Sequence, residues 1–279
     1  MEWLPFATIA YLVWSIATLT SKVLLSRYTS SLVVYTVSLG LVSLLPLLLV
    51  PVRGLTIPNP GLLCMALVGG MLYITVIMLY FKALSLEEAS RVIPLWRFTP
   101  IFVLLLSGYL IDEHLTHYQL IAFVLLVLGG FGVSVKRIGD TFKLSPAFYW
   151  MLFSSLVGAI YNVLIKFIYL RLPYYDGFTL IRFGATLTAL AVLSIPKNRL
   201  VLFNSLASVS NSIKALILFN AVLDLIGLAF LNFALSLAPV TLVNASAGIQ
   251  AVFVLFFSTA ISWKFPHVLK EDIDRRTLT

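Results

Sequence analysis

Long apolar stretches constrain this chain more than any other feature. Six runs contain no Lys, Arg, Asp or Glu, and they cover residues 3–21, 28–52, 54–81, 114–135, 144–165 and 225–263. A helix needs about 20 apolar residues to cross the hydrocarbon of a bilayer. Each run is long enough for one crossing, and the last is long enough for two. Backbone groups in lipid must be bonded internally, so these runs predict helices rather than open strands.

Composition excludes most other classes of protein. Hydrophobic residues make up 61% of the 279 residues and charged residues only 11%, whereas about 25% is usual for charged residues in globular domains. A disordered chain, a disulfide-rich secreted domain and an ordinary soluble enzyme are therefore excluded. The net charge of +8 does not indicate nucleic-acid binding, because the cations are scattered between the apolar runs. Such flanking cations set the orientation of spans.

The fold class expected is all-α, a polytopic bundle in contact with membrane lipids. The N-terminus lacks a basic n-region, so the first apolar run is expected to be a retained span. Residues 200–213 are expected to lie at the membrane interface, and residues 264–279 form a charged tail. About nine spans are predicted, at residues 3–25, 31–50, 61–81, 90–111, 118–135, 145–170, 177–195, 214–237 and 240–263.

The two halves of the sequence resemble each other. Lys22 lies 144 residues before Lys166, and Gly40 lies 144 residues before Gly184. The word Ala-Leu-Ser-Leu at residues 83–86 recurs 151 residues later at 234–237. These matches predict a first repeat at 1–138 with five helices and a second at 144–263 with four. The tenth helix is apparently absent, through truncation or as a natural variant.

A repeat of five helices has odd parity, so the second copy enters the membrane inverted. Inverted repeats place a binding site near the midplane and open alternately to either side in many transporters. The alternative is a duplication without any role in transport.

Several motifs resemble one family. They are residues 80–90, Pro100, the stretch Leu110–Thr116 and the Gly129-Gly130 pair, with a looser match at Asn232–Leu235. Together they are similar to the EamA-type, ten-helix members of the drug/metabolite transporter superfamily. The second half departs from the pattern where Lys264 stands in place of a glutamate. The resemblance implies a fold and secondary transport, and it does not name a substrate.

Ionisable groups deep in a span are the main candidates for function, because each is costly there unless paired or hydrated. Asp224 lies ten residues past Lys214, about 15 Å along a helix and close to the midplane. Asn220 precedes it by one turn on the same face. Asp224 is interpreted as a proton-titrating or ammonium-binding carboxylate, and a structural bond between helices is the alternative.

Arg97 is a candidate anion clamp beside Trp96, between two prolines that bend the segment. If the helix begins later, Arg97 lies at the interface instead. Arg182 could pair with Asp176 outside the core.

The remaining candidates each have a structural alternative. Lys22 and Lys166 are expected to extend to the headgroups, although their equivalence suits a pair of gates. Trp14 and Tyr161 could line a pocket, with packing as the alternative. Asn244 lies on a face of small residues typical of close helix packing, and it could face a cavity.

No Walker A loop or dinucleotide fingerprint is present, so no ATP drive and no cofactor is expected. Glu113, His114 and His117 are too few for a metal site, and none is predicted. The function predicted is secondary transport of a small polar metabolite, similar to an amino or organic acid, across the cell membrane. Proton coupling is a further possibility. A lipid-modifying enzyme and a non-transporting membrane protein are the alternatives.

The orientation of the chain has two interpretations. Counting Lys and Arg in the connections places the N-terminus outside. The family resemblance implies cytoplasmic termini instead.

Overall fold

The structure is a computed structural model that describes residues 2–27, 31–84, 86, 95–96, 98–134 and 146–264. Within these residues it is all-α and has seven helical segments long and apolar enough to cross a membrane. Two shorter apolar helices, at Phe98–Leu110 and His117–Gly129, complete a polytopic bundle. These nine segments fall where the nine spans are predicted.

The helices follow one another with short connections over most of the described chain. Their bounds are α1 (Trp3–Arg27), α2 (Leu32–Val42), η1 (Leu45–Leu49), α3 (Val50–Arg53), α4 (Pro60–Leu84), α6 (Phe98–Leu110), α7 (His117–Ser134), α8 (Pro146–Tyr169), α9 (Tyr174–Ser194), α10 (Pro196–Ala207), α11 (Asn211–Leu237), α12 (Val240–Ala245) and α13 (Gly248–Lys264).

Two predicted spans are broken where a continuous helix is expected. The second changes to a 3₁₀ helix at η1, which has Pro46 in its first turn. Proline lacks the amide hydrogen that a continuing α-helix needs there. The ninth is divided into α12 and α13 at Ser246 and Ala247, and all six residues of α12 are buried. The expected start of the fourth span near Ser90 falls on residues 85, 87–94 and 97, which lie outside the described part, and the described helix α6 covers Phe98–Leu110.

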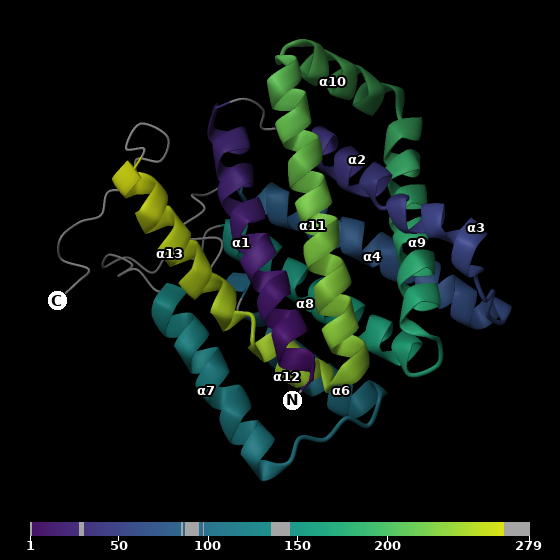
Figure 1. Cartoon of the computed structure of the whole chain (residues 1–279), viewed down its shortest axis with the longest axis vertical. Coiled ribbons are helices and arrows are strands. Elements are labelled where there is room, and N and C mark those ends of the chain that lie inside the picture. The colour runs from purple at the N-terminus through teal and green to yellow at the C-terminus, as the bar shows by residue number, and fades with distance from the viewer. Residues whose placement is uncertain are drawn as a thin grey trace.

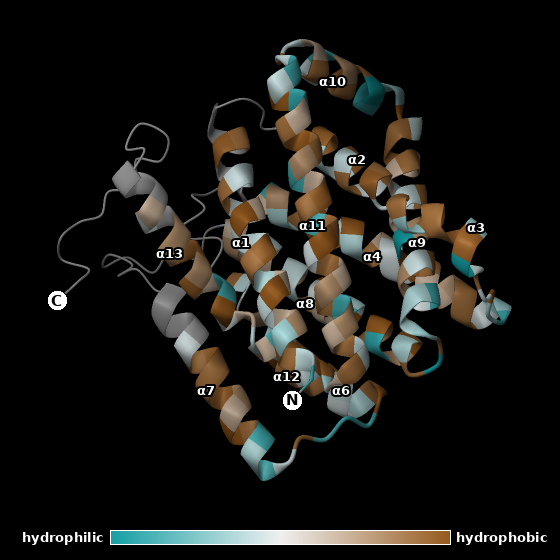
Figure 2. Ribbon diagram, in the orientation of Figure 1, coloured by the Kyte–Doolittle hydropathy of each residue, from teal (hydrophilic) through white to brown (hydrophobic). Residues whose placement is uncertain are grey.

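The bundle has a densely packed centre and a layer at one side. Helices α1 and α11 lie side by side, with α8 behind them, and α7 and α13 form the side layer (Figure 1). Figure 2 shows apolar colour along α7 and α13 and hydrophilic colour at ends such as the start of α10. Large exposed apolar side chains, among them Leu125, Leu128, Leu255 and Phe256, lie on these two helices. Such faces suit lipid as a solvent.

Contacts between helices come in matched pairs. Helix α1 packs along α11, and α4 packs along α8. Helix α13 packs on α1, and α6 packs on α8. The sequence offsets of 144 and 151 residues make α1 equivalent to α8, α4 to α11 and α6 to α13. Replacing each helix by its equivalent turns the first contact of each pair into the second.

Glycines allow a close crossing between α4 and α9. A Cβ atom at Gly70 would collide with the backbone of Ala185 and Ile181. A Cβ atom at Gly184 would collide with the backbone of Leu67. Because small residues let helix backbones approach in membranes, these two glycines fix the distance between α4 and α9.

Gly70→Ala tests this crossing. We expect the substitution to destabilise the protein by about 1–3 kcal/mol, because neither backbone can move aside without disturbing its own helix. Gly129→Ala on α7 is the control, since a Cβ atom there meets nothing within 4 Å. Alanine has the higher helix propensity, so the control should melt at the same temperature or higher. Thermal unfolding in detergent measures both, and equal melting temperatures would contradict the interpretation.

Candidate functional site

Arg182 is the most deeply buried charged residue that the structure describes. It lies on α9, and its side chain is 0% exposed. Its Nη2 donates a hydrogen bond to the Tyr161 hydroxyl on α8 over 3.2 Å. Its Nε and Nη1 atoms have no hydrogen-bond partner among the described residues. A buried donor without a partner costs about 1–3 kcal/mol, and more for a charged group, so this arrangement needs an explanation.

Aromatic rings surround the guanidinium. Its carbon lies 4.3 Å from the centre of the Tyr73 ring on α4 and 5.7 Å from that of Phe178. The Tyr73 and Tyr161 rings are 5.9 Å apart. Contact with ring faces partly offsets the cost of burying the cation. Ring faces do not accept directional bonds as a carboxylate does, so the two free N–H edges stay available.

Asp224 lies on α11 beyond Tyr73. The Tyr73 hydroxyl donates a hydrogen bond to Asp224 Oδ2. Trp14 on α1 donates through Nε1 to the Asp224 backbone oxygen over 3.3 Å. Gly227 makes room for Trp14, because a Cβ atom there would overlap the indole ring. Arg182 and Asp224 are both described and form no salt bridge with each other, so Tyr73 separates the two charges.

Asn220 adds a second polar group one turn from Asp224. Its side chain is 6% exposed, and its Nδ2 donates to Ser21 Oγ on α1 over 3.0 Å. Its Oδ1 has no partner among the described residues. The site therefore has unused donors at Arg182 and an unused acceptor at Asn220, close to a partly buried carboxylate. Chemically, it can bind a small polar molecule by complementary hydrogen bonds.

The structure thus brings together five of the predicted residues: Asp224, Asn220, Arg182, Trp14 and Tyr161. Arg97 lies outside the described residues, and the side chain of Lys22 does too. Trp96 lies elsewhere and packs against Tyr80, with ring centres 4.8 Å apart. Asn244 bonds back along α12 to the Val240 oxygen over 2.9 Å.

Two expectations about charged residues are wrong. Lys166 does not extend to the headgroups, since it is 7% exposed and its Nζ donates to the Leu235 and Ala238 oxygens over 2.8 and 2.7 Å. The end of α11 leaves those carbonyls free and so attracts the ammonium. Arg182 forms no ion pair with Asp176, although both are described. The two lie six residues apart, which places them on different faces of α9.

Sequence reasoning missed Tyr73 and the structural role of Glu113. A signal for Tyr73 was present, because the 151-residue offset of the repeat carries Tyr73 onto Asp224. In the sequence, Glu113 is considered as a metal ligand beside His114 and His117. Its carboxylate instead accepts hydrogen bonds from the backbone of Val240 and Thr241.

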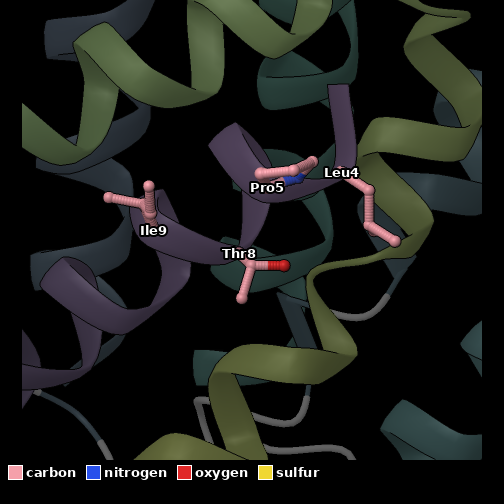
Figure 3. A pocket seen from close by; sticks show the side chains of 4 residues that line it. All are labelled: Leu4, Pro5, Thr8 and Ile9. Atoms are coloured by element: carbon pink, nitrogen blue, oxygen red, sulfur yellow. The ribbon is translucent and has the colours of Figure 1, made fainter. Parts of the chain in front are cut away.

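A surface hollow on α1 is not part of this site. Leu4, Pro5, Thr8 and Ile9 line it (Figure 3). It has one hydroxyl and no charged group, so it lacks the polar chemistry found beside Arg182.

Comparison with known proteins agrees with this architecture. The sequence pattern of the EamA-like transporter family matches residues 1–135. Residues 1–135 belong to the EamA-like transporter family. That family lies in the drug/metabolite transporter superfamily, and its members are membrane transporters, generally without enzymatic activity.

Similarity to a solved structure extends over nearly the whole chain. A solved structure described only as "Crystal structure of protein" superposes with a TM-score of 0.68 at 17% sequence identity. The match covers 98% of this chain and 90% of the other, and it is evidence for the fold alone. No curated protein matches the sequence.

Lys166→Met tests the structural role of this lysine in the EamA-like bundle. The substitution keeps the length of the side chain and leaves two buried carbonyls without a donor, so we expect a loss of about 1–3 kcal/mol of stability. Lys214→Met is the control, because Lys214 lies in the same half of the sequence and its side chain is exposed. Thermal unfolding measures the stability of both variants. A loss of stability in Lys166→Met no larger than that in Lys214→Met would refute the role of Lys166.

Proposed function

We propose that this protein is a secondary transporter of a small polar metabolite, similar to an amino or organic acid, in the cell membrane. The observation that carries the proposal is the pair of unpartnered nitrogens on Arg182, buried beside the Tyr73–Asp224 hydrogen bond. A buried arginine cannot lose its proton, so it needs negative charge or acceptors near it. A solute that enters this site supplies them.

The free donors favour a solute with an anionic group. Nε and Nη1 donate from different edges of the guanidinium, and a planar carboxylate can accept from either of them together with the second hydrogen of Nη2. Tyr73 and Tyr161 cover the guanidinium and exclude water, which strengthens such bonds. Asp224 and the Asn220 oxygen provide acceptors for donors elsewhere on the same solute.

We further propose alternating access between two inverted halves, at 1–138 and 144–263, and the matched contacts between helices support it. Tyr73 and Asp224 are equivalent positions of the two halves under the 151-residue offset, and they bond directly to each other. Equivalent residues of two such halves meet near the axis that relates them. This contact supports a solute site at the axis, as in other transporters built from inverted repeats.

The alternative, a lipid-modifying enzyme, would need a cluster of carboxylates or histidines at one interface, and Asp112, Glu113 and His114 are its candidates in the sequence. Glu113 is instead bonded to the backbone of α12. His114 and Asp112 form an exposed pair, 2.9 Å apart, at 77% and 93% exposure. A non-transporting protein is distinguished by a thermal-shift screen against metabolites, in which it would show no stabilisation by any solute.

Arg182→Gln tests the proposed binding role. We expect uptake of an anionic or zwitterionic solute into proteoliposomes to fall at least about tenfold. The variant loses hydrogen bonds between a charged group and the solute, and each such bond contributes about 1.5–3 kcal/mol. Arg171→Gln is the matched control, since Arg171 is exposed at the end of α8, and its uptake should equal that of the wild type. Selectivity of the wild-type protein for hydrophobic cations would overturn the proposal.

Asp224→Asn tests proton coupling. The amide keeps an acceptor for the Tyr73 hydroxyl but does not titrate. We expect uptake driven by a pH gradient to be lost, while exchange of labelled for unlabelled solute continues. Solute-induced alkalinisation, followed with a pH dye outside the vesicles, measures the difference. Coupling that persists unchanged in the variant would remove Asp224 from the mechanism.

A further inference from the structure

Glu113 joins the end of the first half to a helix of the second. Its Oε2 accepts from the Val240 amide over 2.8 Å. Its Oε1 accepts from the amide and the hydroxyl of Thr241, over 3.1 and 2.7 Å. Pro239 has no amide hydrogen, so Val240 and Thr241 supply the first free donors of α12. A carboxylate at this end of a helix is favourable for the same reason.

The backbone before Glu113 holds its side chain in place. Asp112 has a φ of 54°, which is uncommon for a residue other than glycine, though aspartate tolerates it well. The Glu113 amide donates to the Ser107 oxygen over 3.2 Å. The Ser107 hydroxyl also contacts the Thr241 hydroxyl at 3.1 Å, so α12 is bonded both to α6 and to Glu113, which follows α6. Strained backbone of this kind persists where surrounding bonds fix it.

Lys166 bonds to the other side of the connection between α11 and α12, which we call the corner. It donates to Leu235 and Ala238, the last carbonyls of α11, while Glu113 accepts from the first amides of α12. The corner between α11 and α12 therefore has a cation at its carbonyl side and an anion at its amide side. Lys166 belongs to the same half as the corner, and Glu113 belongs to the other half. If the two halves separate here, the Glu113 bonds must break, together with the Ser107–Thr241 contact and the bond from the Tyr11 hydroxyl to the Val243 oxygen.

The opposite end of the bundle has a different residue at the equivalent position. The offset of 151 residues carries Glu113 onto Lys264, a cation that cannot accept a bond from an amide. The sequence thus supplies this carboxylate to one half and a lysine to the other.

We propose that Glu113 is a latch, a positioning residue that holds the bundle closed at the corner between α11 and α12. The proposal rests on the proposed alternating access and names the contact that must open at this end. Opening exposes α12, whose residues are buried in the present state. The bonds of Glu113 to Val240 and Thr241 thereby set how often this end opens.

Cysteine labelling tests the latch without any solute. In a Cys64→Ser background, Ala245→Cys places a thiol on α12, where Ala245 is 2% exposed. The rate of reaction with a polar maleimide in nanodiscs reports how often α12 is exposed. Glu113→Gln should raise this rate about tenfold, because the charged acceptor is lost and an NH₂ group faces the amides. Thr241→Val should raise it less, since it removes the hydroxyl bond to Glu113 and the contact with Ser107 but keeps both backbone amide bonds to the Glu113 carboxylate.

Two controls separate the latch from a general loosening of the fold. Asp112→Asn keeps the left-handed backbone and leaves Glu113 intact, so its labelling rate should equal that of the wild type. Ala159→Cys on α8, where Ala159 is 0% exposed, should label slowly in both the wild type and Glu113→Gln. Equal labelling of Ala245→Cys with and without Glu113→Gln would overturn the latch, as would parallel rises at both thiols. A wild-type protein that labels as expected and moves no solute would refute transport instead.

Discussion

The cost of an unpaired polar group in a lipid-embedded bundle governs this structure. Arg182 is completely buried, its charge is permanent, and the nearest carboxylate lies on the far side of a tyrosine. The protein reduces the cost with one hydroxyl and two ring faces and leaves two nitrogens unused. A bundle selected for stability alone has no reason to keep such a group. A bundle that must attract a polar solute away from water has one, because the unmet bonds become binding energy when the solute arrives.

The same rule explains the ends of helices inside the bundle. α11 and α12 meet within the protein, where water cannot bond their free carbonyls and amides. Lys166 and Glu113 replace the water, one charge at each side of the corner. The Glu113 carboxylate is fully bonded there, whereas Arg182, which we propose to bind the solute, retains two nitrogens without a partner among the described residues.

The sequence was sufficient for the class of fold and for most of the site. Lengths of charge-free runs predict the spans, because the thickness of the bilayer is fixed. Depth along a helix predicts Asp224 and Asn220. Pairing between helices was not predictable, and each error follows from that. Lys166 was expected to extend to the headgroups because nothing in its own segment indicates that the carbonyl end of α11 lies beside it. Tyr73 was missed because a tyrosine in a span usually indicates packing, and only its place in the repeat connects it to Asp224.

Departures from the internal symmetry are where the two halves take different roles. If positions 73 and 224 had the same residue, two aspartates or two tyrosines would meet at the axis. Neither combination has both a hydroxyl donor and a charged acceptor. With Tyr73 in one half and Asp224 in the other, a single carboxylate is bonded by a hydroxyl from its own equivalent position. Glu113 and Lys264 are a second departure, at the ends of the bundle rather than at its centre. A symmetric transporter would have equal energies in its two end states. In the proposed cycle, a charge present in one half alone makes those energies unequal, and one end then rests closed until a solute reaches the centre.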